Sequence, residues 1–244
     1  MLRVGAYWPS SATDLDTEQR RLAQLRPEPW RPPAAGLTAA GCFLAFARGE
    51  QGPGRAGDRG WAAAVVVAVG SGLTVAHHCR SCLAGAPYEA GRLALREGPC
   101  LGEAVAGLPV RPDVAIVDAT GRDHPRRAGL ALHLGAALGL PTVGVTHRPL
   151  LAAGSEPGPD RGVQSPLELD GEVVGAWLRT QPGARPVAVH AGWRTDPRTA
   201  VRVVLACVGA ARTPEPLRRA RQLARTTRAH AEGRTTQALR DPLG

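Results

Sequence analysis

Residues 113–150 read DVAIVDATGRDHPRRAGLALHLGAALGLPTVGVTHRPL and decide the fold expected for this chain. Four consecutive apolar residues, Val114–Val117, predict a short buried strand that ends at Asp118. The Ala/Leu-rich segment 126–140 has the spacing of a helix, and a second apolar run follows at 142–145. Apolar runs on both sides of a helix are typical of parallel strands that are buried on both faces. We therefore expect two adjacent parallel strands joined by a helix.

Polar side chains follow both expected strands, Asp118 after the first and His147 after the second. Open α/β sheets bind their ligands at the carboxyl ends of the strands. A carboxylate there suits a hard divalent cation, which prefers oxygen ligands and can activate water for phosphodiester hydrolysis. An imidazole would add a nitrogen ligand and shift the preference from Mg²⁺ toward Mn²⁺ or Zn²⁺. The competing interpretations are a turn acid for Asp118 and an ordinary loop residue for His147.

The rest of the chain adds further strands and helices to this unit. Strands are expected at 38–48, 61–69 and 74–82, a hairpin at the sheet edge in 167–179 and 186–191 with its turn at Asp170-Gly171, and helices at 14–25, 196–208 and 214–231. The fold class is therefore α/β, with a ribonuclease-H-like mixed sheet in which an antiparallel meander precedes the parallel strands and helices flank the sheet. Residues 1–232 are interpreted as one domain and residues 233–244 as a flexible tail.

The charge of the chain favours a nucleic-acid partner. The formal net charge is +9, and all 30 basic residues are arginine. Arginine binds phosphate with two parallel hydrogen bonds, which suits it to nucleic acid. Genome composition explains the absence of lysine, but it does not explain the excess of positive charge. The arginines at 218–228 are expected either to form a solvated helix face or to attract phosphate without regard to sequence.

Cysteine usage and apolar content bound the cellular setting. The chain has five cysteines, an odd number, and no N-terminal signal segment, which predicts a reducing, cytoplasmic environment. No apolar run reaches the roughly 18 residues that a membrane helix needs, so no membrane span is expected. The sequence HHCRSC at 77–82 offers only half of a zinc site, and adjacent strand residues point to opposite faces, so zinc is not expected there.

Several segments of this sequence occur in the same order in a known family. The core is DATGRDHPRRAG at 118–129, followed by GLPTVGV at 139–145. YEAGRLALREGP at 88–99 precedes it, and Pro-Glu-Pro at 214–216 follows it. On these segments the chain resembles the endonuclease V family of deoxyinosine-repair nucleases, over about residues 17–226. The resemblance implies the same ribonuclease-H-like fold.

The resemblance also implies a function. It implies a monomeric, metal-dependent nuclease that nicks DNA, or RNA, on the 3′ side of a deaminated purine such as hypoxanthine. Mg²⁺, or alternatively Mn²⁺, would be held weakly by Asp118 and Glu97, with His147 as a further candidate ligand. Glu97, Asp118 and His124 would be the catalytic residues, and His124 would support a phosphate at the N-terminus of the following helix. The residues implied to contact nucleic acid are Tyr88, Gly91, Gly121, Arg126 and Arg127.

Two features place these candidates more closely. Glu97 is expected near the start of a helix, with Pro99 in its first turn. Tyr88 lies in a loop, and by resemblance it is a wedge that fills the gap left when a nucleotide is flipped out. We expect Glu97, Asp118 and His124 to face one cleft that Tyr88 borders. The competing interpretations are a surface tyrosine at 88 and ordinary first-turn residues at 124–127.

The chain departs from the family's pattern at three polar positions. The family's first acid, a metal ligand, falls on Phe43, its lysine on His147 and its late histidine on Trp193. Two hypotheses therefore remain open: an active nuclease, or a catalytically weakened or inactive homologue that binds nucleic acid. A third hypothesis is a different chemistry in a site built from His147, Asp118 and His190.

Overall fold

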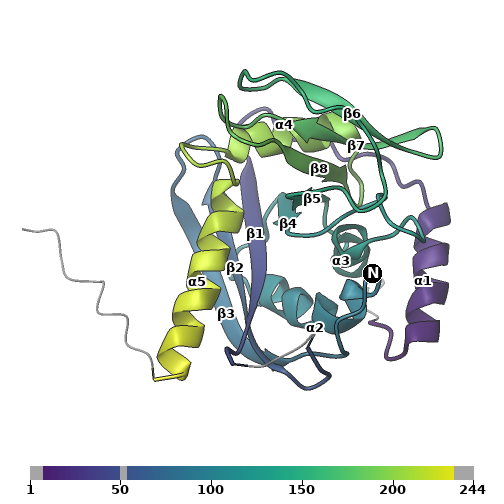
Figure 1. Cartoon of the computed structure of the whole chain (residues 1–244). Helices are drawn as coiled ribbons and strands as arrows, with labels where there is room; N and C mark the ends of the chain where they lie inside the picture. The colour runs from purple at the N-terminus through teal and green to yellow at the C-terminus, as the bar shows by residue number, and fades with distance from the viewer. Residues whose placement is uncertain (1–7, 50–53, 234–244) are drawn as a thin grey trace, which may run out of the picture.

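The computed structural model describes residues 8–49 and 54–233, which contain one eight-stranded mixed sheet (Figure 1). The strands are β1 (Thr38–Phe46), β2 (Arg59–Ala68), β3 (Thr74–Leu83), β4 (Val114–Val117), β5 (Thr142–Thr146), β6 (Gln164–Leu169), β7 (Glu172–Leu178) and β8 (Val187–Ala191). Their order across the sheet is β3-β2-β1-β4-β5-β8-β7-β6. β1, β2 and β3 form the antiparallel meander, and β1, β4 and β5 run parallel. The α/β, ribonuclease-H-like mixed sheet expected from the sequence is confirmed.

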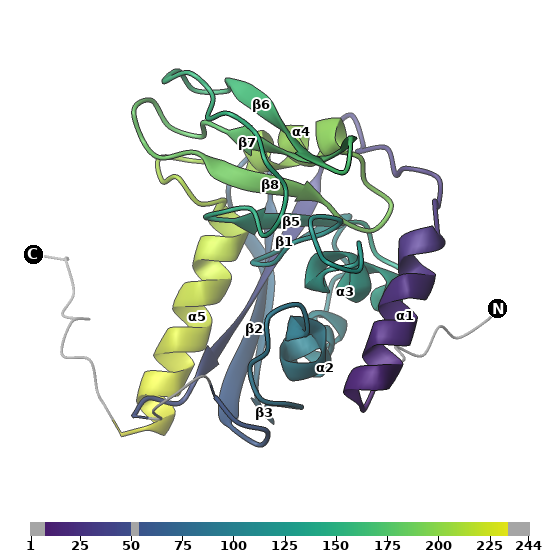
Figure 2. The same cartoon turned by 45° about the vertical axis from the view of Figure 1, so that its right-hand side comes forward.

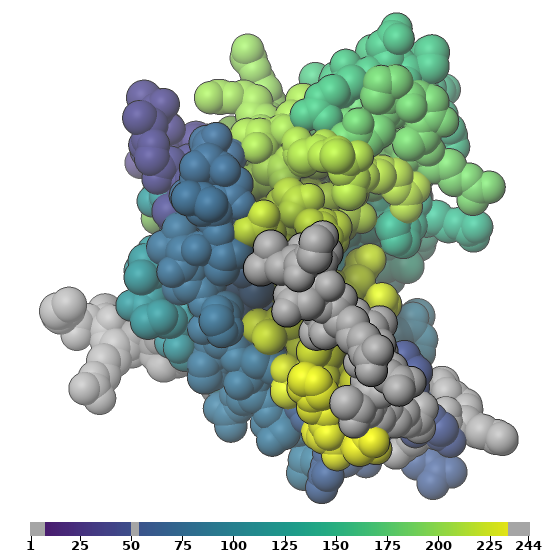
Figure 3. Space-filling view, turned by 90° about the vertical axis from the view of Figure 1, so that its left-hand side faces the viewer, coloured from purple at the N-terminus to yellow at the C-terminus, as the bar shows by residue number. Residues whose placement is uncertain are grey.

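Helices flank both faces of this sheet, as expected. Within the described residues they are α1 (Ala12–Gln24), α2 (Leu93–Ala106), α3 (Leu130–Leu138), α4 (Pro197–Cys207) and α5 (Glu215–Ala231). α5 lies against β1 and β2 on one face, and α2 and α3 lie on the other with α1 outside them (Figures 1 and 2). One apolar layer lies under α2 and α3, and a second lies under α4 and α5. Figure 3 shows the outer side of α5 beside the strands of the meander.

The helix expected over 126–140 begins later, because a turn precedes it. α3 starts at Leu130. Arg127 has a φ of 56°, which an α-helix does not allow, and its N–H donates to the carbonyl of His124 at 2.8 Å. Residues 124–127 therefore form a turn, and the prediction that His124 lies at the start of a helix is wrong.

The expectation for Pro99 also needs correction. α2 begins at Leu93, so Glu97 lies just past its first turn and Pro99 lies inside the helix rather than in its first turn. A proline at an interior position removes one backbone N–H from the helix. The edge hairpin is confirmed: Asp170 and Gly171 join β6 to β7 with φ of 50° and 75°, the left-handed pair that a two-residue hairpin turn favours.

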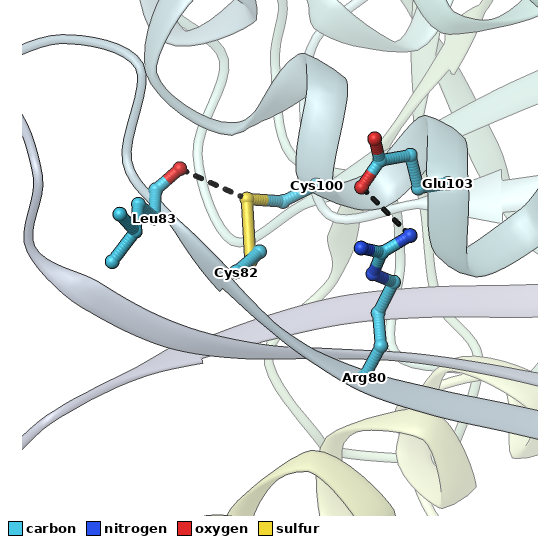
Figure 4. Close-up of a disulfide and its surroundings, with 5 residues drawn as sticks. All are labelled: Arg80, Cys82, Leu83, Cys100 and Glu103. Carbon is cyan, nitrogen blue, oxygen red and sulfur yellow. Dashed lines mark hydrogen bonds and ion pairs between the residues drawn. A yellow bond between two sulfur atoms is a disulfide. The ribbon is translucent and has the colours of Figure 1, made fainter.

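A disulfide joins β3 at the sheet edge to α2 (Figure 4). Cys82 is bonded to Cys100, with 5.9 Å between their Cα atoms. Beside this bond, Arg80 pairs with Glu103 at 3.0 Å. No disulfide was expected from the sequence, so this bond between two of the five cysteines is a cross-link that only the structure shows. The bond also uses a cysteine that a zinc site at 77–82 would need.

Two further expectations concern membrane spans and the C-terminal tail. No helix among residues 8–49 and 54–233 is both long and apolar enough to cross a membrane. The predicted tail, 233–244, lies outside the described residues apart from Gly233. Its flexibility therefore stays a prediction.

Candidate functional site

A cavity of about 230 Å³ opens beyond the ends of β4 and β5. Its walls come from the loop before α2, the loop after β4 and the loop after β5. The sequence-predicted site residues that line it are Tyr88, Gly91, Asp118 and His124. The sequence-predicted residues that do not line it are Glu97, Gly121, Arg126, Arg127 and His147.

Asp118 follows β4 directly and is paired with an arginine from a distant part of the sequence. Its Oδ2 accepts a hydrogen bond from Nη2 of Arg221 on α5 at 2.9 Å. Cys42 of β1 is aligned with Val117 of β4, so the next residues along, Phe43 and Asp118, are neighbours. The guanidinium carbon of Arg221 lies 5.1 Å from the centre of the Phe43 ring. Phe43 and Arg221 therefore both stand beside Asp118.

Glu97 lies on α2, which covers the face of the sheet opposite to α5, and it is close enough to Asp118 for the two charges to interact. Burial raises the pKa of Glu97 to about 7, Arg96 opposes this rise, and the negative charge of Asp118 adds to it. Burial raises the pKa of the Cys42 thiol to about 12, and the charges of Asp118 and Glu97 contribute. Both acids therefore lie near Cys42. A glutamate with a pKa near 7 is partly protonated at neutral pH, which makes it a weaker ligand for a cation.

His124 is buried, and protein groups occupy both of its ring nitrogens. Its Nδ1 accepts a hydrogen bond from the N–H of Arg126 at 3.1 Å. Its Nε2 therefore carries the proton and donates to the carbonyl of Gly91 at 3.0 Å. Burial lowers the pKa of His124 to about 4, so the ring is neutral at neutral pH. His124 lines the cavity, but these contacts hold the neighbouring loop and leave neither nitrogen open to a phosphate.

The carbonyl of Gly91 anchors the loop that carries Tyr88. It also accepts hydrogen bonds from Nη2 of Arg126 at 2.6 Å and from Nε2 of Gln19 at 3.4 Å. Arg126 is held in turn by Oε1 of Gln19 at 2.6 Å and by Asp16 at 3.3 Å. These contacts fix the loop against α1. Tyr88, which is 52% exposed, therefore projects at the edge of the cavity from a well-supported backbone.

Arg127 and Gly121 have structural roles away from the cavity. Nη2 of Arg127 donates to the carbonyl of Leu169 at 2.9 Å and to Asp170 at 3.1 Å, in the β6–β7 hairpin. A Cβ added to Gly121 would lie 1.9 Å from the carbonyl oxygen of Ala191, so the packing of this loop on β8 requires glycine. The expected contacts of Arg127 and Gly121 with nucleic acid stay predictions.

Among the described residues, no hydrogen bond or ion pair joins His147, Asp118 and His190, the residues of the alternative site. Nδ1 of His147 lies 2.6 Å from Nη2 of Arg212. Burial and the positive charge of Arg212 lower the pKa of His147, while Asp118 acts in the other direction. His190 is fully buried, and its Nε2 lies 2.8 Å from Oγ1 of Thr146. Each of the three residues is thus bonded to a different partner.

The residues around Asp118 do not fit a divalent metal. No group of three or more His, Cys, Asp or Glu side chains able to hold a metal ion occurs within the described part of the chain. Mg²⁺ can bind through one or two carboxylates, but it needs oxygen atoms that are free to coordinate. Asp118 is already paired with Arg221, and Phe43 beside it offers no oxygen.

Sequence reasoning missed Arg221, which appeared only as one member of a basic helix. The signal was present in its spacing. Leu217 and Ala224 are buried on the inner side of α5, and Arg221 lies four residues after the first and three before the second. Side chains at these intervals share one face of a helix, so Arg221 had to point inward.

Comparisons with known proteins agree with this fold. The sequence model of the endonuclease V family matches residues 38–222. An endonuclease V from Roseiflexus sp. (strain RS-1) is 45% identical over 172 residues, which are 70% of this chain and 77% of that protein. The structure of endonuclease V from Streptomyces avermitilis superposes with a TM-score of 0.82 at 36% identity, covering 93% of this chain and 97% of that chain.

A more distant structure shares the fold. Ciona intestinalis endonuclease V, solved with a 24mer DNA containing an inosine followed by a ribo-adenosine, has a TM-score of 0.75 at 20% identity and covers 90% of this chain and 98% of that chain. The match at residues 38–222 and the identity to the Roseiflexus and Streptomyces proteins decide the family. The chain belongs to the endonuclease V family, whose members are generally metal-dependent nucleases.

Proposed function

We propose that this chain binds DNA, or RNA, that contains a deaminated purine such as hypoxanthine, and that its nicking on the 3′ side of that base is slow or absent. The cavity that joins the exposed Tyr88 to Asp118 carries the proposal. Its volume of about 230 Å³ is smaller than the pockets of about 300–1,000 Å³ that hold drug-sized ligands, so it suits a single base. Family membership supplies the substrate class.

Recognition rests on base flipping. Extruding a nucleotide costs a few kcal/mol, and an aromatic side chain that enters the gap offsets part of that cost. Tyr88 is 52% exposed, and its loop is fixed through the carbonyl of Gly91, so the ring can enter a duplex with little loss of loop entropy. The formal charge of +9 adds attraction to phosphate that does not depend on sequence and that salt weakens.

Weak hydrolysis follows from the groups around Asp118. By the resemblance, Phe43 falls where the family has its first acid, and His147 falls where it has a lysine. Losing one electrostatic contributor of this kind typically costs about 10²- to 10³-fold in rate. Both losses act on one centre, so the two factors need not multiply. The Mg²⁺ or Mn²⁺ that the family implies enters no step of this proposal, because Asp118 is engaged by Arg221.

An active nuclease is the competing function, and the placement of a second buried carboxylate, Glu97, near Asp118 favours it. Burial raises the pKa of Glu97 to about 7, with Arg96 opposing and Asp118 adding to the rise. A general base works best when its pKa lies near the working pH, so Glu97 is suited to take a proton from water. Whichever function holds, we propose that the protein acts as a monomer in the cytoplasm.

Fluorescence anisotropy with labelled oligonucleotides tests the recognition. We expect tighter binding to a duplex with one inosine than to the same duplex without it, and a steep loss of affinity as salt rises. Tyr88→Ala should remove most of the inosine preference, while Tyr88→Phe, which keeps the ring, should retain it. Equal affinity of the unmodified protein for both duplexes would refute the recognition half of the proposal.

A further inference from the structure

We propose that Arg221 is a built-in cation that takes the place of a divalent metal beside Asp118, so that the cleft binds the phosphate backbone of nucleic acid without a metal ion. The proposal starts from the 2.9 Å ion pair between Nη2 of Arg221 and Oδ2 of Asp118. It rests on the proposed function only in taking the cleft as a nucleic-acid site.

The packing of α5 turns Arg221 toward the sheet. Leu217, Ala220 and Ala224 are buried on the side of α5 that faces β1 and β2. Arg221 follows Leu217 by four residues, so it leaves the helix on the same side. Its side chain is 22% exposed, whereas Arg218 on the same helix is 46% exposed and pairs with Glu215. An inward arginine needs a partner for its charge, and Asp118 supplies it.

The aromatic ring of Phe43 on β1 lies beside the guanidinium of Arg221. The centre of its ring lies 5.1 Å from the guanidinium carbon of Arg221 and 5.6 Å from that of Arg225. The electron-rich face of an aromatic ring attracts cations of this kind. The same ring has no oxygen to offer to Mg²⁺, which binds oxygen ligands. The residue beside Asp118 therefore favours a guanidinium and disfavours a metal ion.

Electrostatic repulsion disfavours the presence of both Arg221 and a divalent metal ion beside Asp118. A divalent ion at Asp118 would have to displace Arg221 or lie within a few ångström of its positive charge, where like charges repel strongly in a partly buried place. With Arg221 present, Asp118 is neutralised without a metal. Arg221 and Arg225 then bring two guanidinium groups to the Phe43 ring, and the first is bonded to Asp118, which lines the cavity. Guanidinium groups bind phosphate through paired hydrogen bonds.

Binding of Mn²⁺ alone tests the metal half of the proposal without nucleic acid. The EPR signal of free Mn²⁺ should show that the unmodified protein has no binding site that depends on Asp118. Asp118→Asn should therefore leave Mn²⁺ binding unchanged. Phe43→Asp alone should raise the affinity for Mn²⁺ only slightly, because Arg221 would pair with the new carboxylate. Phe43→Asp combined with Arg221→Ala should bind Mn²⁺ at least about tenfold more tightly than Phe43→Asp alone. The control variant, Phe43→Asp with Arg218→Ala, also removes one positive charge from α5. Its affinity for Mn²⁺ should equal that of Phe43→Asp alone.

Two results of this experiment would overturn the proposal. One is a Mn²⁺ site in the unmodified protein that Asp118→Asn abolishes. The other is equal Mn²⁺ affinity in Phe43→Asp and in the variant that also carries Arg221→Ala. Circular dichroism of each variant is the control, because it distinguishes a misfolded variant from a folded variant that has lost binding.

Affinity for an inosine-containing oligonucleotide tests the phosphate half. The unmodified protein should bind equally well in EDTA and in Mg²⁺ at matched ionic strength. Arg221→Ala should weaken binding several-fold in EDTA and reduce the salt slope by about one unit. Arg221→Lys keeps the charge but not the paired hydrogen bonds, so its affinity should lie between those of the unmodified protein and Arg221→Ala. Arg218→Ala should have a smaller effect than Arg221→Ala.

The outcomes separate this proposal from the proposed function. Equal losses in Arg221→Ala and Arg218→Ala, or an affinity that collapses in EDTA, would overturn the role of Arg221. A missing preference for inosine, with the Mn²⁺ results as expected, would instead overturn base recognition and leave the role of Arg221 standing.

Discussion

Replacing Phe43 with aspartate places a carboxylate where the resemblance puts the family's first acid, yet we expect this change alone not to restore nicking. The new carboxylate would lie near two guanidinium groups, whose carbons are now 5.1 and 5.6 Å from the ring centre. It should therefore pair with Arg221 and Arg225 rather than remain open to a metal. The Arg221 positive charge would also still neutralise Asp118.

The stability cost of Phe43→Asp follows from its partial burial. Full burial of a large apolar side chain contributes about 1.5–3 kcal/mol, so the loss at the half-buried Phe43 is roughly half of that. New ion pairs with partly exposed arginines would return about 0.2–1 kcal/mol each. The two contributions are of similar size, so the net change in free energy of unfolding is about zero and stays within about 1 kcal/mol of it. Differential scanning calorimetry should therefore show a change in Tm of no more than about 2–4 °C for a chain of this size.

The catalytic effect appears only when Arg221 is also removed. Phe43→Asp with Arg221→Ala should raise single-turnover nicking of an inosine duplex in Mg²⁺ by about 10²-fold over Phe43→Asp alone. The matched control is Phe43→Asn with Arg221→Ala, which keeps the shape but not the charge and should stay slow. Nicking by Phe43→Asp that is as fast as nicking by the double variant would refute the reasoning.

Three further predictions concern stability. Burial lowers the pKa of His190 to about 4 against an unfolded value near 6.5, so the unfolded state takes up a proton first as pH falls. His190 should therefore contribute a loss of about 1.4 kcal/mol of stability per pH unit as pH falls from roughly 6.5 to 4. Denaturant titrations at several pH values should show that the free energy of unfolding of His190→Gln falls less steeply with decreasing pH. Reduction of the bond between Cys82 and Cys100, which are 18 residues apart, should lower the free energy of unfolding by about 3 kcal/mol, and Cys82→Ser should be insensitive to dithiothreitol in the same melt. Gly121→Ala should lower Tm markedly, since its Cβ would lie 1.9 Å from a carbonyl oxygen, whereas Gly183→Ala, with open space around it, should cost only the strain of its positive φ.

The sequence predicted the sheet well because periodicity reports burial. The strand at Val114–Val117, the strand after Pro141 and the Asp170-Gly171 turn all follow from local composition, and the structure confirms them. The start of α3 could not be predicted in this way. Arg127 adopts a left-handed backbone while binding the β6–β7 hairpin, and that hairpin comes more than 40 residues later in the sequence.

The candidate site was predictable only where its residues lie on neighbouring strand ends. Asp118 and the cavity beyond β4 follow from the parallel pairing of β4 with β5. The partner of Asp118 could not be assigned, because the packing of α5 across β1 brings Arg221 to it over a separation of 103 residues. The disulfide was hidden for a similar reason: Cys100 lies on α2, and only the docking of α2 beside β3 brings it to Cys82.

The most direct test of this account is single-turnover nicking by the unmodified protein. An inosine duplex is mixed with excess protein in Mg²⁺, and binding and strand cleavage are measured on the same sample. Because Arg221 pairs with Oδ2 of Asp118 and Phe43 beside it offers no oxygen to a metal, we predict that the duplex is bound but stays intact, or is cut only slowly. Rapid Mg²⁺-dependent cleavage on the 3′ side of the inosine would contradict the account.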